Sequence, residues 1–149
     1  MKKQTIRVSK NTKETIEIAG IFLKKIIKSR PKNATVVGLS GDLGAGKTAF
    51  TKATGKHLGI KNKIDSPTFM IMKKYPIKLK NFKFFFHLDA YRLKNEKELL
   101  HLGWEEIISD REHLVFIEWP ENVSKAIPSS AKFVYISTNA NGYRNLEFK

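Results

Sequence analysis

The feature that most constrains this chain is a glycine-rich stretch between an apolar run and a helical pattern. Gly41-Asp42-Leu43-Gly44-Ala45-Gly46-Lys47-Thr48 matches G-x-x-x-x-G-K-[ST] at every fixed position. In such a loop the glycines let backbone N–H groups approach phosphate oxygens, and the N-terminus of the following helix adds its dipole. Lys47 would reach the β- and γ-phosphates, and the Thr48 hydroxyl would ligate Mg²⁺. The sequence therefore predicts a phosphate-binding loop between a strand and a helix.

The hydrophobic periodicity predicts strands that alternate with helices. We expect strands at 4–9, 34–40, 68–75, 84–88 and 113–117, and a final hairpin of 132–138 and 144–148. We expect helices from 15 to 27, with Asn11 or Thr12 as its cap, and at 47–58, 96–101 and 104–108, and a basic loop at 76–81. This order favours an α/β fold, a single P-loop NTPase-like domain over residues 1–149. Its mostly parallel central sheet would be extended by antiparallel strands, with helices on both faces.

Two acidic residues stand where a nucleotide site needs them. Asp89 follows the apolar run 84–88, and Glu118 ends the run 114–117. Ligands bind at the carboxyl ends of strands in open α/β sheets, so both acids are expected beside the phosphate loop. One would hold the metal and the other would orient the attacking water, and spacing alone leaves open which does which.

Other motifs are ambiguous or misleading. Asn62-Lys63-Ile64-Asp65 spells the guanine-reading N-K-x-D motif, but no apolar strand leads into it, so adenine is the favoured base. His87 and Asp89 are expected on one face of a strand, whereas His57, His101 and His113 are scattered and are expected to be surface or packing residues. Trp119 follows Glu118 directly and could cover the nucleotide or pack in the core.

Composition narrows the class of protein. The chain has no cysteine, which excludes disulfides, Cys-based zinc sites and thiol nucleophiles, and no apolar run is long enough for a membrane span. We therefore expect a cytoplasmic protein that does not bind membranes. The net charge is +14, of which residues 1–63 carry +12. Such a field attracts polyanions, but most of the basic residues are Lys, which also serves solubility.

Four stretches occur in this order along the chain: the glycine-rich loop, Ser66-Pro67-Thr68-Phe69, His87-Leu88-Asp89-Ala90-Tyr91-Arg92-Leu93 and Ile117-Glu118-Trp119. Together they resemble the TsaE (YjeE) family, P-loop ATPases of tRNA threonylcarbamoyladenosine biosynthesis. The resemblance covers nearly the whole chain. It implies a Mg²⁺-dependent ATPase that binds ATP/ADP and a partner pair, TsaD and TsaB. That pair attaches the threonylcarbamoyl group beside the anticodon of tRNAs that read codons beginning with A, and the ATPase drives turnover rather than the transfer.

The resemblance also implies roles for single residues. Catalysis would depend on Lys47, Asp89, Glu118 and a switch-like Thr68, and the metal on Thr48, Glu118 and Asp89. The nucleotide would contact Gly41, Gly44, Ala45, Gly46, Lys47, Thr48, Ala49, Trp119 and Arg144. Ala49 replaces a common second hydroxyl residue, so a contact to the α-phosphate would be missing. We expect slow hydrolysis by the chain alone and faster hydrolysis with the partners. Contact with tRNA would be indirect, and direct contact through the basic N-terminal half stays open.

Two other functions share part of this pattern. A small-molecule kinase would use the same loop, but it usually adds an acceptor-binding insert and an Arg-rich lid, for which only Arg144 is available after Trp119. A basic RNA-binding module with a vestigial loop would bind RNA whether or not Lys47 is intact. The preserved loop and acids favour the ATPase.

Overall fold

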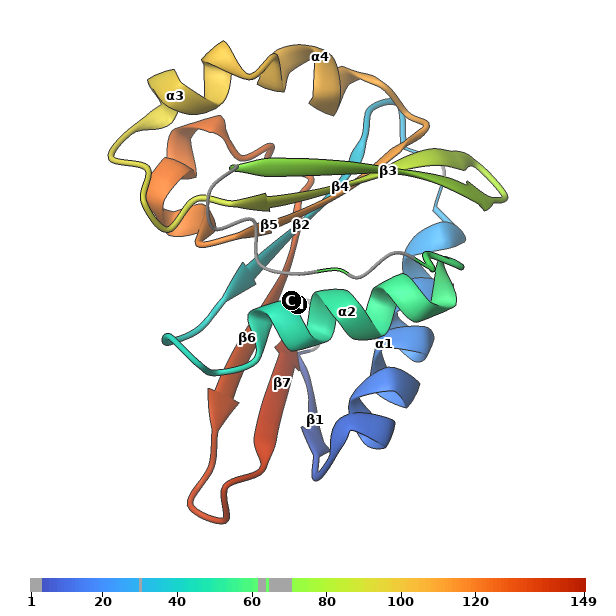
Figure 1. Cartoon of the computed structure of the whole chain (residues 1–149), viewed down its shortest axis with the longest axis vertical. Coiled ribbons are helices and arrows are strands. Elements are labelled where there is room, and N and C mark those ends of the chain that lie inside the picture. The colour runs from blue at the N-terminus through green and yellow to red at the C-terminus, as the bar shows by residue number, and fades with distance from the viewer. Residues whose placement is uncertain (1–3, 30, 62–63, 65–70) are drawn as a thin grey trace.

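All strands of the described residues belong to one sheet. The computed structural model describes residues 4–29, 31–61, 64 and 71–149. The strands are β1 (Thr5–Ser9), β2 (Thr35–Ser40), β3 (Met72–Leu79), β4 (Phe82–Asp89), β5 (His113–Glu118), β6 (Lys132–Thr138) and β7 (Arg144–Phe148). They form a seven-stranded sheet in the order β1-β7-β6-β2-β5-β4-β3 (Figure 1).

The centre of this sheet is parallel and its edges are antiparallel. β2 pairs in parallel with β5 and β6, and β4 pairs in parallel with β5. The hairpins β3–β4 and β6–β7, and the pairing of β1 with β7, add antiparallel strands on both sides. The predicted α/β fold with a mostly parallel centre is confirmed.

Helices cover both faces of the sheet. One face packs against α1 (Thr12–Ile27) and α2 (Lys47–His57), and the other against α3 (Glu96–His101), α4 (Trp104–Ser109) and the 3₁₀ segment η1 (Pro120–Ala126). Neighbouring residues of β2 divide between the two cores, because successive side chains of a strand point to opposite faces: Val37 joins the α1–α2 core and Val36 the α3–α4 core. No helix of the described residues is long and apolar enough to cross a membrane.

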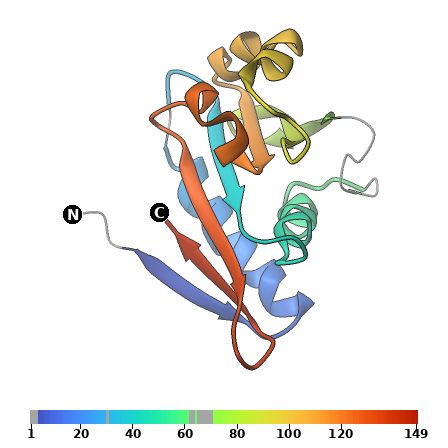
Figure 2. The ribbon, with the colours of Figure 1, turned by 90° about the vertical axis from the view of Figure 1, so that its left-hand side faces the viewer.

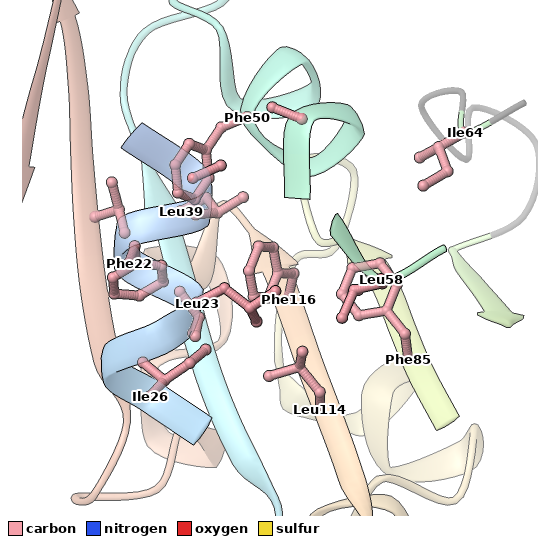
Figure 3. Packing of buried hydrophobic residues seen from close by; sticks show 14 of the residues in the cluster. Phe22, Leu23, Ile26, Leu39, Phe50, Leu58, Ile64, Phe85, Leu114 and Phe116 are labelled. Atoms are coloured by element: carbon pink, nitrogen blue, oxygen red, sulfur yellow. The ribbon is translucent and has the colours of Figure 1, made fainter. Parts of the chain in front are cut away.

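The first helix shows how local sequence and packing agree. The Asn11 side chain caps α1 by accepting a hydrogen bond from the Glu14 backbone N–H at 2.9 Å, which selects Asn11 over Thr12 as the cap. Phe22 and Ile26, one turn apart, lie on the buried side of the helix. In Figure 3 Leu23 of the same helix extends toward Phe116 of β5, so the apolar stripe of α1 anchors the helix on the sheet.

One predicted loop is wrong. The basic loop expected at 76–81 is mostly strand, because β3 runs through Pro76 to Leu79 and turns only at Lys80, which has a φ of 43°. β3 is an edge strand, where proline is tolerated because one side of the strand needs no ladder hydrogen bonds. Buried Tyr75 and Ile77 alternate with exposed neighbours, a period of two that the lysines obscured. The predicted start of this strand, 68–70, lies outside the described residues.

Candidate nucleotide-binding site

Three neighbouring strands end at one edge of the sheet, and the candidate site is built on their ends. β2 leads into the glycine-rich loop and then α2, a path that Figure 2 shows plainly. Glu118 is paired with Leu39 of β2 on one side and with Asp89 of β4 on the other. Parallel strands bring their carboxyl ends to the same edge, so both acids lie beside the loop as the sequence predicted.

Lys47 is held inside the loop. Its Nζ donates hydrogen bonds to the carbonyl oxygens of Gly41 at 2.5 Å and Asp42 at 2.9 Å, and the residue is only 4% exposed. Burial lowers the pKa of the Lys47 ammonium, while nearby carboxylates, Glu118 foremost, act in the opposite direction. The loop therefore holds a desolvated cation at its centre, ready for an anionic ligand.

The two acids differ in their surroundings. Glu118 is buried, at 3% exposure, and both of its carboxylate oxygens accept from the Thr48 hydroxyl at 3.1 Å. Asp89 is half-buried, and its Oδ1 accepts from the Tyr91 backbone N–H at 2.9 Å. The Thr48–Glu118 contact joins the first turn of α2 to the end of β5.

Most of the predicted residues line one cleft. This cleft has a volume of 580 Å³, and the predicted residues that line it are Gly44, Gly46, Lys47, Thr48, Ala49, Asp89, Glu118 and Trp119. Gly41 and Ala45 belong to the loop without lining the cleft. Arg144 lies against the loop, because a Cβ added to Gly46 would come within 2.7 Å of its Nε. Thr68 and the rest of Ser66-Pro67-Thr68-Phe69 lie outside the described residues, as do Asn62, Lys63 and Asp65 of the N-K-x-D stretch.

Trp119 combines the two roles that the sequence left open. Its ring centroid lies 4.4 Å from the Lys47 Nζ and 5.1 Å from the Tyr91 ring centroid, so the ring forms part of the cleft wall. The same ring packs against the α3–α4 core. Trp119 has a left-handed φ of 59°, and η1 follows it immediately, held by a 2.7 Å hydrogen bond from the Ser40 hydroxyl to Glu121. This turn keeps the ring beside the loop.

Sequence reasoning missed part of the cleft wall. Tyr91, Arg92 and Leu93 line the cleft directly after Asp89, and Ile71, Glu98 and Leu43 complete its lining. A signal for the first three existed, because they follow a buried strand at the edge where the site was expected. Nothing in the local pattern pointed to Ile71 or Glu98, which reach the cleft through tertiary packing.

The histidines do not form a metal site. His57 and His113 contact the backbone carbonyls of Ile16 and Ile107, at 2.6 Å and 2.8 Å. No group of three or more His, Cys, Asp or Glu residues within the described chain is arranged to hold a metal. His87 is different, because its Nε2 lies 2.6 Å from Oε2 of Glu118.

The donor set fits a nucleotide accompanied by a hard cation. Thr48 and Glu118 offer hydroxyl and carboxylate oxygens side by side, which Mg²⁺ prefers, and Asp89 lies on the adjacent strand. Gly44, in the middle of the loop, has a φ of 78° and no atom within 4 Å of where a Cβ would stand. The loop therefore offers an open cradle next to Lys47.

Comparison with known proteins identifies the relatives of this chain. The model of the family described as "Threonylcarbamoyl adenosine biosynthesis protein TsaE" matches residues 9–146. The tRNA threonylcarbamoyladenosine biosynthesis protein TsaE of Rickettsia typhi is 41% identical over 110 residues, which cover 73% of this chain and 69% of that protein. The Bacillus subtilis protein of the same name is 33% identical over 143 residues, with coverage of 93% and 80%. The match to the Rickettsia felis protein, 40% identical, spans only 60% of its length.

A solved structure supports the fold. The crystal structure of Bacillus subtilis YdiB superposes with a TM-score of 0.75 at 29% identity, covering 99% of this chain and 86% of that one.

Proposed function

Because this chain belongs to the TsaE family, we propose that it is a Mg²⁺-dependent P-loop ATPase that serves the formation of threonylcarbamoyladenosine in tRNA. The observation that carries the proposal is the Thr48–Glu118 contact at 3.1 Å, next to the buried Lys47, which also lines the cleft. A phosphate-binding loop, a metal-binding hydroxyl and a strand-end acid are the parts that phosphoryl transfer requires. Their meeting in one cleft favours nucleotide hydrolysis over simple binding.

The loop would bind the phosphates. The Lys47 ammonium exchanges its hydrogen bonds to loop carbonyls for phosphate oxygens, and the backbone N–H groups of residues 44–48 surround the same oxygens. Arg144, which lies against Gly46, adds a second cation from β7. These donors are already in position when the reaction begins, so they can stabilise the negative charge that develops on the phosphate oxygens in the transition state.

The acids would divide the remaining work. Thr48 and Glu118 hold Mg²⁺, which supplies charge neutralisation at the phosphates when it is bound. Asp89 lines the cleft on the neighbouring strand, is less buried than Glu118 and orients the attacking water. This assignment follows from the contact of Thr48 with Glu118 rather than with Asp89.

Partners would complete the site. Leu43 is 67% exposed and Tyr91 46% exposed, although both line the cleft. Large apolar side chains at the rim of a catalytic cleft suit a protein surface that closes over it. We propose that the TsaD–TsaB pair supplies this surface in the cytoplasm and accelerates a slow basal hydrolysis, while the pair itself transfers the threonylcarbamoyl group.

Contact with tRNA is proposed to be indirect. The +12 net charge of residues 1–63 would also suit direct contact with phosphates. Titration of tRNA onto the isolated chain at two salt concentrations separates the two cases. Tight binding with a steep salt dependence would show direct contact, and weak binding that appears only with the partner pair would show indirect contact.

Binding and hydrolysis of ATP by the wild type and Lys47→Ala test the proposal. We expect Mg²⁺-dependent binding of ATP and ADP in preference to GTP and GDP, with binding and hydrolysis abolished by the substitution. Transfer of phosphate to an added metabolite rather than to water would support a kinase instead. RNA binding without any nucleotide binding would support a vestigial loop and contradict the proposal.

A further inference from the structure

His87 is a buried polar residue beside the candidate site that the proposed mechanism does not use. It is fully buried in β4 and does not line the cleft. Its Nε2 lies 2.6 Å from Oε2 of Glu118, itself buried. A side chain in this position cannot touch the nucleotide and can act only through the carboxylate that it contacts.

The strand register explains why the two side chains meet. Asp89 is directly opposite Glu118, and His87 is opposite Phe116, two residues earlier on each strand. Side chains two residues apart share a face, so His87 and Glu118 are diagonal neighbours on the face covered by α2. The His87 side chain reaches across this diagonal and brings its Nε2 to Oε2 of Glu118.

Glu118 is held from two sides. An ionised carboxylate only accepts hydrogen bonds, so His87 donates through Nε2 in this contact. From α2, the Thr48 hydroxyl reaches both oxygens at 3.1 Å. Oε2 therefore receives two donors and Oε1 only one, which leaves Oε1 as the oxygen with more free acceptor capacity. If the Thr48 hydroxyl turns to a cation, His87 still fixes the carboxylate.

His87 makes no other hydrogen bond within the described residues. Its Nδ1 is buried without a partner there. The partly buried His113, one strand away, instead contacts the backbone carbonyl of Ile107 through its Nδ1. An apolar ring at position 87 would fill the same space without an unpaired polar atom, so the chemical contribution of this imidazole is its contact with Glu118.

From these contacts we propose that His87 is the positioning residue that fixes the Glu118 carboxylate for the Mg²⁺ that accompanies the nucleotide. The proposal rests on the proposed function, because it concerns the same metal. Groups that orient a metal-binding carboxylate commonly control metal affinity by ~10–100-fold. His87 is thus expected to matter for the metal-dependent part of nucleotide affinity and little for the rest.

The test compares ADP affinity with Mg²⁺ and with EDTA in the full chain. The ratio of the two dissociation constants measures the coupling of metal to nucleotide. For His87→Phe we expect the ratio to collapse toward one, a loss of ~10-fold or more in metal-dependent affinity, with the metal-free affinity changed less than ~2-fold. His113→Gln is the matched control, since it removes a partly buried imidazole whose contacts are to the Ile107 carbonyl and the Asp110 carboxylate rather than to the candidate site, and its ratio should equal that of the wild type.

Two further variants separate positioning from folding, because His87→Phe could fail to fold. His87→Gln places an amide nitrogen near the position of Nε2 and should keep the ratio within ~3-fold. His87→Asn is one carbon shorter, cannot reach Glu118 and should lose the coupling. Circular dichroism and thermal melting establish that each variant is folded.

The outcomes are distinct. An equal loss of ADP affinity with and without Mg²⁺, or the same ratio in His87→Gln as in His87→Asn, would show a structural role and overturn this inference alone. An unchanged ratio in His87→Phe would also overturn it. A wild type that binds no nucleotide, or binds it without any effect of Mg²⁺, would overturn the proposed function and this inference with it.

Discussion

Substitution of Gly41 or Gly44 by alanine should produce two different defects, because the glycine-rich loop packs against the sheet at Gly41 and is open to solvent space at Gly44. A Cβ on Gly41 would stand 2.2 Å from the backbone carbonyl oxygen of Ile136 in β6, at a φ of 149°. A Cβ on Gly44 would meet no atom within 4 Å, at a φ of 78°. We therefore expect Gly41→Ala to damage the fold and Gly44→Ala to damage ligand binding.

The magnitudes follow from these contacts. A left-handed backbone costs an alanine ~1–2 kcal/mol, and the loss of glycine's freedom in the unfolded chain returns ~0.4–1 kcal/mol. Gly44→Ala should therefore lower the free energy of unfolding by only ~1 kcal/mol. Gly41→Ala must also push the loop away from a strand of the sheet, and we expect a loss of ~3–5 kcal/mol.

Urea unfolding followed by circular dichroism distinguishes the two. With a slope of ~2 kcal/mol per molar urea, the midpoint should fall by ~1.5–2.5 M for Gly41→Ala and by ~0.5 M for Gly44→Ala. Binding of a fluorescent ADP at low temperature should be weakened at least ~10-fold by Gly44→Ala, because its Cβ enters the cradle that phosphate would occupy. Equal shifts in the unfolding midpoint, or full nucleotide affinity in Gly44→Ala, would refute the reasoning.

Three further predictions concern single side chains. Thr48→Val keeps the shape of the side chain but removes the hydroxyl that contacts Glu118, so Mg²⁺ should no longer strengthen ADP binding in calorimetry. An equal loss of ADP affinity in EDTA would contradict this. Burial lowers the pKa of Lys47 below its usual 10.5. The affinity for ADP should therefore fall as the pH rises toward this lowered pKa, and ADP binding near that pH should take up a proton. Calorimetry in two buffers of different ionisation enthalpy measures this uptake, which should vanish in Lys47→Arg. Trp104, 1% exposed, donates to the Ala126 carbonyl at 2.9 Å, so Trp104→Ala should lower the free energy of unfolding by ~3–5 kcal/mol; a change below ~1 kcal/mol in urea unfolding would contradict this packing.

The parts of the fold that could be predicted are those with one dominant local signal. The run 34–40 is apolar and β-branched and became β2, buried along its whole length. The short helix Glu96–His101 has the bounds that its pattern predicted, and Asn95 caps it by accepting from the Lys97 N–H at 2.9 Å. In both cases propensity and burial agree.

What could not be predicted depends on neighbours that are distant in sequence. The continuation of β3 through Pro76 depends on its place at the edge of the sheet, which no local pattern states. The glycine-rich loop and the two strand-end acids could be placed at one cleft from the sequence because each has a recognisable position in its element. The contact of His87 with Glu118 joins residues 31 apart and follows from the pairing of β4 with β5, which the sequence alone does not specify.

Hydrolysis of ATP in the presence of Mg²⁺, measured with and without the TsaD–TsaB pair, tests the central claim most directly. The account predicts slow hydrolysis by the chain alone, a clear increase with the pair, and loss of both in Lys47→Ala. Fast hydrolysis that ignores the pair, or activity that survives the Lys47 substitution, would contradict a partner-gated ATPase built on this loop.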